Sequence, residues 1–244
     1  MNGVNWARQA GASVRLEWGA AAVERLADDV DCAIVVDVMS FSTCVDVAVA
    51  RGASVYPYAW RDASARDYAA ACGAEVAGTD RRLAEGWSLS PTSLGRVPKG
   101  LKLVLPSPNG SAIAFHAREK GVAVLCGGLR NRRATARACA TYRRVLVVAC
   151  GERWPDGSLR PALEDLIGAG GIVAALGRAG ASPEARAAAL AYEALGDARR
   201  ATLADCASAR ELVERSFAAD VAPCLDEDAS DTAALLVRDC FVAA

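Results

Sequence analysis

Acids, small hydroxyls, glycines, an amide and arginines follow several short apolar runs of this chain. Together these residue types suit an oxyanion ligand with a divalent metal ion, because backbone N–H groups and arginines hold the anion while carboxylates hold the metal. If the runs are strands of one parallel sheet, their carboxyl ends meet at the edge where α/β proteins bind ligands. The residues are Asp37, Ser40, Ser42 and Thr43; Asp80 and Arg81; Ser107, Asn109, Gly110 and Ser111; Gly127, Gly128, Arg130 and Asn131; and Glu152.

Asp37 has the clearest setting among these residues. It follows the apolar, mostly β-branched run 33–36, which is typical of a strand buried on both faces. Ser40, Ser42 and Thr43 offer N-cap groups for a helix that the pattern predicts up to about Arg51. Asp37 is therefore expected at the carboxyl end of a central strand, facing a helix N-terminus. The alternative is that it only caps the helix.

The segment Ser107-Pro-Asn-Gly-Ser111 is the best candidate for a phosphate-binding loop. Gly110 and the following helix N-terminus would bring backbone N–H groups close to the ligand. The segment matches neither a Walker A loop nor a Rossmann fingerprint, since no Lys follows and no G-x-G-x-x-G is present. Asn-Gly is also a common turn pair, so a turn without a ligand stays open.

Glu164 and Asp165 lie in the first turn of a helix predicted to begin at Pro161. Acids in a first turn favour the helix dipole without any further role. Neighbouring helix residues point about 100° apart, so at most one of the two is expected to face a site squarely.

The cysteine and histidine content narrows the chemistry. The chain has nine Cys and one His, His116, and no C-x-x-C pair, so buried reduced thiols are expected rather than disulfides or zinc. A catalytic Ser-His-Asp triad with spare partners and a multi-His metal site are both excluded. If a metal is bound, oxygen ligands must hold it, which favours Mg²⁺ or Mn²⁺.

The charge balance gives no reason to expect nucleic acid or an anionic membrane as a partner, because 28 Lys and Arg face 29 Asp and Glu. No apolar run approaches the ~20 residues that span a bilayer. Residues 1–9 lack the plan of a signal peptide. We expect a cytoplasmic protein with a small-molecule ligand, and a homodimer is possible.

The elements that must position the site alternate between strands and helices, most regularly from Lys102 onward. The length of 244 residues suits a single α/β domain, 1–244, or two similar halves of about 1–100 and 101–244 that share one core. The long irregular stretch 83–98 is expected to be a functional flap, and the tail 232–244 a closing strand. Predicted strands are 13–18, 33–36, 53–58, 75–80, 103–105, 122–126 and 144–149, and predicted helices include 20–26, 62–72, 111–120, 130–142, 161–176, 183–195 and 210–215.

In order along the chain, the motifs resemble the 2-phosphosulfolactate phosphatase family. They are Asp37-Val-Met-Ser-Phe-Ser-Thr, Asp80-Arg81, Pro-Asn-Gly-Ser, Gly-Gly-Leu-Arg-Asn, Ala149-Cys-Gly-Glu and Leu163-Glu164-Asp165, and the likeness runs from about Ile34 to the Asp220 region. The resemblance implies a magnesium-dependent phosphatase, associated with coenzyme M synthesis, on a three-layer α/β/α fold with a largely parallel central sheet. It also implies that Asp37, Asn109, Glu164 and Asp165 belong to the metal and phosphate site.

The residues and the resemblance together give a set of expected roles. Asp37, Asn109 and Glu164 are expected to be catalytic, and Asp37, Glu152 and Asp165 to bind Mg²⁺. Whether Asp37 binds the metal or attacks phosphorus stays open. The expected substrate-binding residues are Ser40, Ser42, Thr43, Arg81, Ser107, Gly110, Ser111, Arg130 and Asn131.

The chain departs from the family pattern at two places. Ser40 stands where the family usually has Arg, and Gly86-Trp-Ser-Leu-Ser90-Pro91 is a shortened form of the family's flap. A hydroxyl cannot replace the planar fork of Arg, although Arg81 or Arg130 could reach in and compensate. We therefore expect poor activity toward phosphosulfolactate and a preference for a less anionic phosphoester.

Two other functions compete with a phosphatase of a small acidic phosphomonoester. One is a cysteine hydrolase of the isochorismatase type, for which Lys102 and Cys126 are present. The other is a non-catalytic anion-binding descendant of the phosphatase family, which the loss of an Arg would fit. Magnesium-dependent release of phosphate from a generic ester separates the phosphatase from both.

Overall fold

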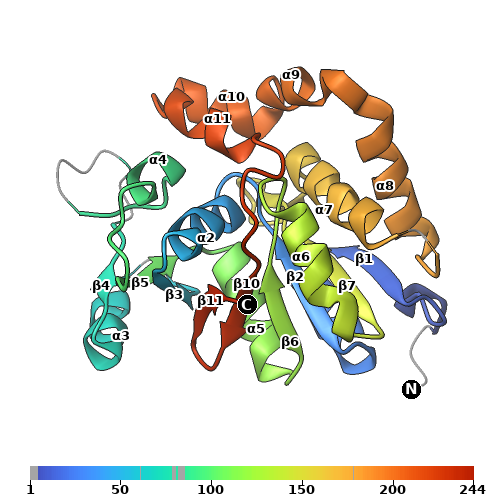
Figure 1. Ribbon diagram of the computed structural model, residues 1–244, viewed down its shortest axis with the longest axis horizontal. Helices are drawn as coiled ribbons and strands as arrows, with labels where there is room; N and C mark the ends of the chain where they lie inside the picture. The colour runs from blue at the N-terminus through green and yellow to red at the C-terminus, as the bar shows by residue number, and fades with distance from the viewer. Residues whose placement is uncertain (1–4, 61, 79–80, 82–85, 178) are drawn as a thin grey trace.

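The computed structural model describes residues 5–60, 62–78, 81, 86–177 and 179–244 (Figure 1). Its centre is a nine-stranded sheet in the order β1-β7-β2-β6-β10-β11-β3-β5-β4. Every pair in this sheet is parallel except those made by β10 and β11, which confirms the prediction of a largely parallel sheet. The strands are β1 Val14–Trp18, β2 Cys32–Val36, β3 Ser54–Tyr58, β4 Glu75–Val76, β5 Lys102–Pro106, β6 Ala123–Cys126, β7 Val145–Ala149, β10 Ala234–Val237 and β11 Cys240–Ala243.

Helices cover both faces of the sheet, so the three-layer α/β/α architecture is confirmed. Helices α1, α2 and α5 pack on one face, and α6, α7 and α8 pack on the other. The smaller helices α4, α9, α10 and α11 lie along one side of the molecule in Figure 1. The helices are α1 Gly19–Leu26, α2 Phe41–Ala50, α3 Ser64–Cys72, α4 Pro91–Leu94, α5 Gly110–Glu119, α6 Arg132–Ala138, α7 Leu163–Leu176, α8 Pro183–Leu195, α9 Arg199–Ala204, α10 Ala207–Glu214 and α11 Val221–Cys224.

Strand β2 is central because both of its faces are apolar. Cys32, Ile34 and Val36 lie in the core under α6 and α7, whereas Ala33 and Val35 lie in the core under α1, α2 and α5. All five side chains are fully buried. Such two-sided burial is what the apolar run 33–36 predicted, and it places Asp37 at the carboxyl end of a strand that the core holds on both sides.

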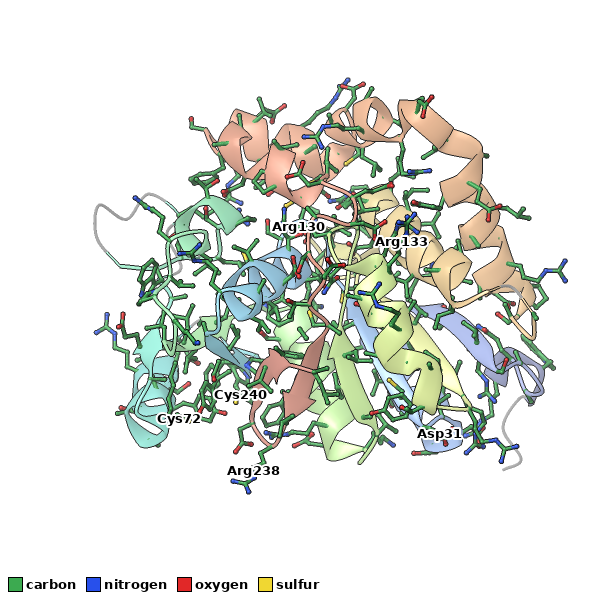
Figure 2. The ribbon with its side chains drawn as sticks, viewed as in Figure 1. Asp31, Cys72, Arg130, Arg133, Arg238 and Cys240 are labelled. Carbon is green, nitrogen blue, oxygen red and sulfur yellow. The ribbon has the colours of Figure 1, made fainter. Side chains whose placement is uncertain are left out.

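The C-terminal tail differs from the single closing strand expected for 232–244. It forms the antiparallel hairpin β10–β11, which lies between β6 and β3 and joins two parallel sets of strands. The turn falls at the polar pair Arg238-Asp239, and Arg238 takes the left-handed conformation with φ of 57° (Figure 2). Strands from residues 1–100 and 101–244 therefore interleave in one sheet, while the division into two halves stays a prediction.

Two further expectations about the elements need correction. Helix α7 begins at Leu163 and not at Pro161, because Ala162 before it is still extended, with φ of −111° and ψ of 124°. The stretch 86–98 is not wholly irregular, since it contains α4, whose N-cap Ser90 accepts a hydrogen bond from the N–H of Ser93 at 3.2 Å. Residues 82–85 of the expected flap lie outside the described residues. In the described part of the chain, no helix is both long and apolar enough to cross a bilayer.

Two glycines of α7 allow close packing against neighbouring elements. A Cβ at Gly170 would lie 2.1 Å from the carbonyl oxygen of Ala188 in α8, and one at Gly168 would lie 2.7 Å from Val38 Cγ2. The backbone oxygen of Ala188 cannot move out of the way as a flexible side chain could. Helix α8 can therefore approach α7 only because residue 170 has no side chain.

We expect Gly170→Ala to lower the free energy of unfolding by about 1–3 kcal/mol, since overpacking forces backbone shifts. Gly95→Ala is a matched control, because its Cβ would lie 3.4 Å from the nearest atom, the oxygen of Pro91, at ordinary contact distance. Urea denaturation of both variants measures the difference. Equal stability of Gly170→Ala and the native protein would show that α7 and α8 do not pack this closely.

Candidate active site

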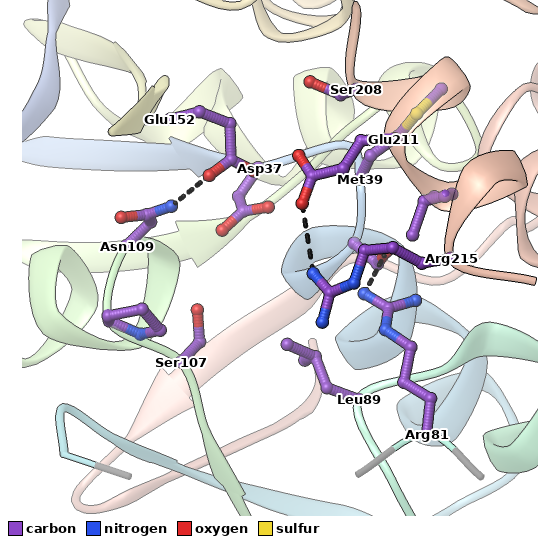
Figure 3. A pocket seen from close by; sticks show the side chains of 13 residues that line it. Asp37, Met39, Arg81, Leu89, Ser107, Asn109, Glu152, Ser208, Glu211 and Arg215 are labelled. Carbon is purple, nitrogen blue, oxygen red and sulfur yellow. Dashed lines mark hydrogen bonds and ion pairs between the residues drawn. The ribbon is translucent and has the colours of Figure 1, made fainter. Parts of the chain in front are cut away.

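A polar cavity of about 120 Å³ lies between the carboxyl edge of the sheet and helix α10 (Figure 3). The loops after β2, β5 and β7 form its floor and one wall, α10 forms the opposite wall, and Arg81 and Leu89 close the side. Six of the predicted site residues line it: Asp37, Ser40, Arg81, Ser107, Asn109 and Glu152. Asp80, which was predicted to lie at the site together with Arg81, is outside the described residues.

Asp37 is held in place by the N-termini of two helices. Its Oδ1 accepts the N–H of Phe41 at 3.1 Å, at the start of α2, and its Oδ2 accepts the N–H of Gly110 at 3.0 Å, at the start of α5. The N-termini of α2 and α5 thus hold both oxygens of the carboxylate. Asp37 thus caps a helix, as the simpler alternative supposed, and it also lines the cavity.

Glu152 approaches Asp37 from the loop after β7. The amide of Asn109 donates from Nδ2 to its Oε2 at 2.9 Å, which joins the loops after β5 and β7 (Figure 3). Burial raises the pKa of Glu152 to about 8, and the negative charges of Asp37, Glu164 and Glu211 add to the effect, while Arg160 opposes it. Carboxylates thus crowd one side of the cavity at a cost that a bound cation would relieve.

Two arginines supply the opposite charge. Arg81 donates from Nη2 to the hydroxyl of Ser40 at 3.0 Å and from Nη1 to Asp220 at 2.8 Å. Arg215 donates to Glu211 at 3.0 Å, one turn earlier along the same chain segment. Figure 3 shows both guanidinium groups on the side of the cavity away from Asn109 and Glu152. The two guanidinium groups therefore lie on one side of the cavity, each paired with an acid, and Asp37 and Glu152 lie on the other side.

Glu164 and Asp165 do not line the cavity, and their expected roles as catalytic residue and metal ligand stay predictions. Asp165 uses one oxygen to accept the N–H of Val38 at 2.7 Å and the other to accept the N–H of Gly151 at 2.8 Å. Glu164 is 2% exposed and accepts the thiol of Cys206 at 3.3 Å. Asp165 therefore fixes the loops that carry Asp37 and Glu152, whereas Glu164 acts on Glu152 through its charge.

Burial raises the pKa of Asp165, and the charges of Glu164 and Asp37 raise it further, against its two backbone hydrogen bonds. A carboxyl group in this position ties the ends of β2 and β7 together. Its function in the described structure is therefore to hold the adjacent loops in register.

The remaining predicted substrate-binding residues turn away from the cavity, because local backbone groups use their polar atoms. Ser42 accepts the N–H of Asp37 at 2.7 Å, and Thr43 donates to the carbonyl of Val38 at 2.8 Å. Such local bonds are the usual alternative to ligand binding for Ser, Thr and Asn after a strand. Ser111 donates to Leu105 O, Asn131 bonds Gly128 N and Cys126 O, Arg130 pairs with Asp46 and Asp226, and Gly110 contributes its N–H to Asp37. Figure 2 labels Arg130.

Helix α10 overlaps the helix predicted over 210–215, but the sequence did not predict that it lines the site. It contributes Ser208, Glu211 and Leu212, and Arg215 follows directly after it. The sequence signal was Glu211 four residues before Arg215, a spacing that brings the two side chains together on any helix. Because that spacing is common on solvent-facing helices, it does not by itself mark a binding site.

The donor groups suit Mg²⁺ by type. Asp37, Glu152 and Glu211 offer carboxylate oxygens to the cavity, and His and Cys do not line it. Within the described residues, no three Asp, Glu, His or Cys side chains are gathered closely enough to form a complete ligand cage. Mg²⁺ does not need such a cage, since it keeps several waters and binds through one or two carboxylates plus phosphate oxygens.

The cysteine-hydrolase alternative finds no support in the geometry. Cys126 is fully buried, and burial raises the pKa of its thiol above the ordinary value. Lys102 is the first residue of β5, at the opposite edge of the sheet from the cavity. The described structure thus brings no reactive thiolate and lysine together.

The fold and the cavity define a class: an α/β protein whose sheet edge carries facing acidic and basic groups around a small polar site. The chain belongs to the 2-phosphosulpholactate phosphatase family, whose family model matches residues 21–239. This is the family that the motifs resemble, and the matched region includes every residue named above as lining the cavity. Comparison with curated proteins found no match.

The raised pKa of Glu152 predicts how metal-free stability changes with pH. Glu152 keeps its proton to about pH 8 in the folded protein, but only to about pH 4.5 in the unfolded chain. Its contribution to the free energy of unfolding is therefore fully present below pH 4.5 and is lost as pH rises through 8. In EDTA, Glu152→Gln should raise the melting temperature at pH 9 relative to the native protein by a few degrees, and by less at pH 5. Parallel melting curves across this range would contradict the assigned environment of Glu152.

Proposed function

We propose that this protein is a magnesium-dependent phosphatase that hydrolyses a small acidic phosphomonoester. The observation that carries the proposal is the division of one small cavity into an acidic side, with Asp37 and Glu152, and a basic side, with Arg81 and Arg215. Family membership supports a phosphatase.

Electrostatics favour a metal ion and a phosphate together over either alone. A phosphate dianion that binds the arginines also approaches Asp37 and Glu152, and like charges at close range oppose each other strongly away from water. A divalent cation between the carboxylates and the phosphate removes that repulsion. Asp37 and Glu152 would hold Mg²⁺, with Glu211 as a further donor, and the bound ion would neutralise charge on the phosphoryl oxygens.

The protein's own residues would orient the reacting groups. The N–H groups of Phe41 and Gly110 fix both oxygens of Asp37, and the amide of Asn109 fixes Glu152. Such preorganised groups need no rearrangement when charge develops in the transition state. Asp37 would act either as a metal ligand or as the nucleophile on phosphorus, and both roles fit its position.

The size and charge of the cavity suggest the class of substrate. A volume of about 120 Å³ is well below the ~300–1,000 Å³ of a usual ligand pocket, which favours a small ester. Arg81 reaches the hydroxyl of Ser40, so it supplies a guanidinium where the family pattern has its own Arg, whereas Arg130 is paired elsewhere. An acidic ester fits these arginines, and the expected preference over phosphosulfolactate stays a prediction.

Placement in the cytoplasm and a homodimer also stay predictions. The non-catalytic alternative would use the same cavity to bind an anion without hydrolysis. The two predictions below separate it from a phosphatase.

Asp37→Asn should lower kcat for phosphoester hydrolysis by roughly 10²–10⁴, the usual scale for a positioned acid or base. Asp31→Asn is the matched control, because Asp31 lies at the other end of the same strand, where it pairs with Arg144 at 3.0 Å (Figure 2). Steady-state kinetics with p-nitrophenyl phosphate and circular dichroism of both variants provide the test. Near-native kcat in a folded Asp37→Asn variant would remove Asp37 from the mechanism.

Chelation should abolish phosphate release, and Mg²⁺ or Mn²⁺ should restore it, because the donors at the cavity are oxygens. Zn²⁺ is expected to give no advantage over these ions. Phosphate release after dialysis against EDTA, with each metal added back, measures this. Undiminished release in the metal-free protein would refute the magnesium requirement, and absence of release with every metal and ester would favour the anion-binding alternative.

A further inference from the structure

We propose that Asp220 is a positioning residue for substrate binding, which holds the guanidinium of Arg81 at the cavity wall. The inference deepens the proposed function and rests on it, since Arg81 is taken there to bind the phosphoester. Asp220 itself does not line the cavity in the described structure, so any effect it has on the ligand must pass through Arg81.

Contacts on several sides restrict the guanidinium of Arg81. Nη1 donates to Asp220 Oδ2 at 2.8 Å, Nη2 donates to Ser40 Oγ at 3.0 Å, and the ring of Phe217 lies 5.7 Å from Cζ. The side chain of Arg81 is 14% exposed and that of Asp220 is 4% exposed. These two bonds use two of the five N–H donors of an arginine. The group is therefore oriented by its neighbours and still reaches the cavity.

The second oxygen of Asp220 fixes a different part of the wall. Oδ1 accepts the hydroxyl of Ser90 at 2.6 Å and the N–H of Thr92 at 3.3 Å, both at the N-terminus of α4. Leu89, next to Ser90, lines the cavity. One carboxylate thus joins Arg81, the start of α4 and the segment after α10, so a buried acid far along the chain sets the shape of the basic side.

A free arginine side chain would lose several rotamers each time it bound a phosphate, and that lost freedom weakens binding. Asp220 removes this freedom before the ligand arrives. A buried carboxylate also offsets the cost of keeping a guanidinium largely out of water. If binding of the ester is equally strengthened in the ground state and the transition state, loss of Asp220 should raise KM and leave kcat almost unchanged.

The pair could instead be an ordinary structural ion pair, like Arg132 with Asp228 at 2.6 Å in the same C-terminal part of the chain. Two observations favour a role at the site. Arg81 lines the cavity whereas Arg132 does not, and Asp220 also bonds the Ser90–Thr92 segment that borders the cavity. Asp228→Asn is therefore a matched control that removes an Arg–Asp pair away from the site.

The test compares Asp220→Asn, Arg81→Gln, the double variant and Asp228→Asn. Calorimetry measures the Kd of inorganic phosphate with Mg²⁺ present, and kinetics with p-nitrophenyl phosphate give kcat and KM. We expect Asp220→Asn to raise both Kd and KM about tenfold, as for loss of a hydrogen bond between charged groups. Asp228→Asn should change neither by more than about twofold.

The double variant is decisive, because Asp220 is proposed to act only through Arg81. The Kd of the double variant should equal that of Arg81→Gln within about twofold. Multiplied effects of the two substitutions would show that Asp220 stabilises the fold without positioning Arg81. An unchanged Kd and KM in Asp220→Asn would also overturn the proposal.

Failure of this inference can be told apart from failure of the proposed function. If phosphate binding shows the coupling but no ester is hydrolysed, Asp220 positions Arg81 in an anion-binding protein. If hydrolysis occurs without coupling between Asp220 and Arg81, the protein is a phosphatase in which Asp220 does not position Arg81. Should Asp220→Asn not fold by circular dichroism, Asp220→Glu keeps the charge, and it should weaken phosphate binding in the native background but not beside Arg81→Gln.

Discussion

The architecture of the site depends on one close approach, in which the carboxylate of Asp37 receives N–H groups from the first turns of two helices. Phe41 donates one N–H from the start of α2, and Gly110 donates the other from the start of α5. A Cβ on residue 110 would lie 2.2 Å from the ring of Phe41 and 2.9 Å from Asp37 Oδ2, so only glycine allows the helices to converge. The buried strand β2 then holds Asp37 itself, and the loops after β5 and β7 reach the same point through Asn109 and Glu152.

Once these loops converge, their acids repel one another, and the protein manages that repulsion in different ways. The carboxyl group of Asp165 ties loops together through two backbone N–H groups, out of contact with the cavity. Glu152 faces the cavity with a raised pKa, so a cation beside it would lower the cost of its charge. The arginines on the far side supply the complementary charge for an anion. The division of the cavity therefore follows from how the sheet edge and α10 meet, and it is the physical basis for proposing a metal ion and a phosphoester.

Much of the acidic side could be predicted from the sequence, because each part follows an apolar strand. The run 33–36 located Asp37, and the same reasoning brought Asn109 and Glu152 to one edge. The hydroxyls were overpredicted, since Ser42, Thr43 and Ser111 satisfy nearby backbone carbonyls or N–H groups, and sequence alone does not show where a hydroxyl points. Glu164 and Asp165 are first-turn acids of α7, as predicted, but both are buried away from the cavity lining.

The basic side was harder to predict, because α10 and Asp220 lie far from Arg81 along the chain and carry no local signature of a site. The hairpin β10–β11 was not predicted for a related reason. Its place between β6 and β3 depends on how strands pair across the whole sheet.

The most direct test of the central claim is anomalous diffraction from a crystal soaked with Mn²⁺ and phosphate. We predict a manganese peak in the cavity with the carboxylates of Asp37 and Glu152 as ligands, and a phosphate between the ion and Arg81. A manganese peak at another site with the cavity empty, or a phosphate bound away from both arginines, would contradict the proposal.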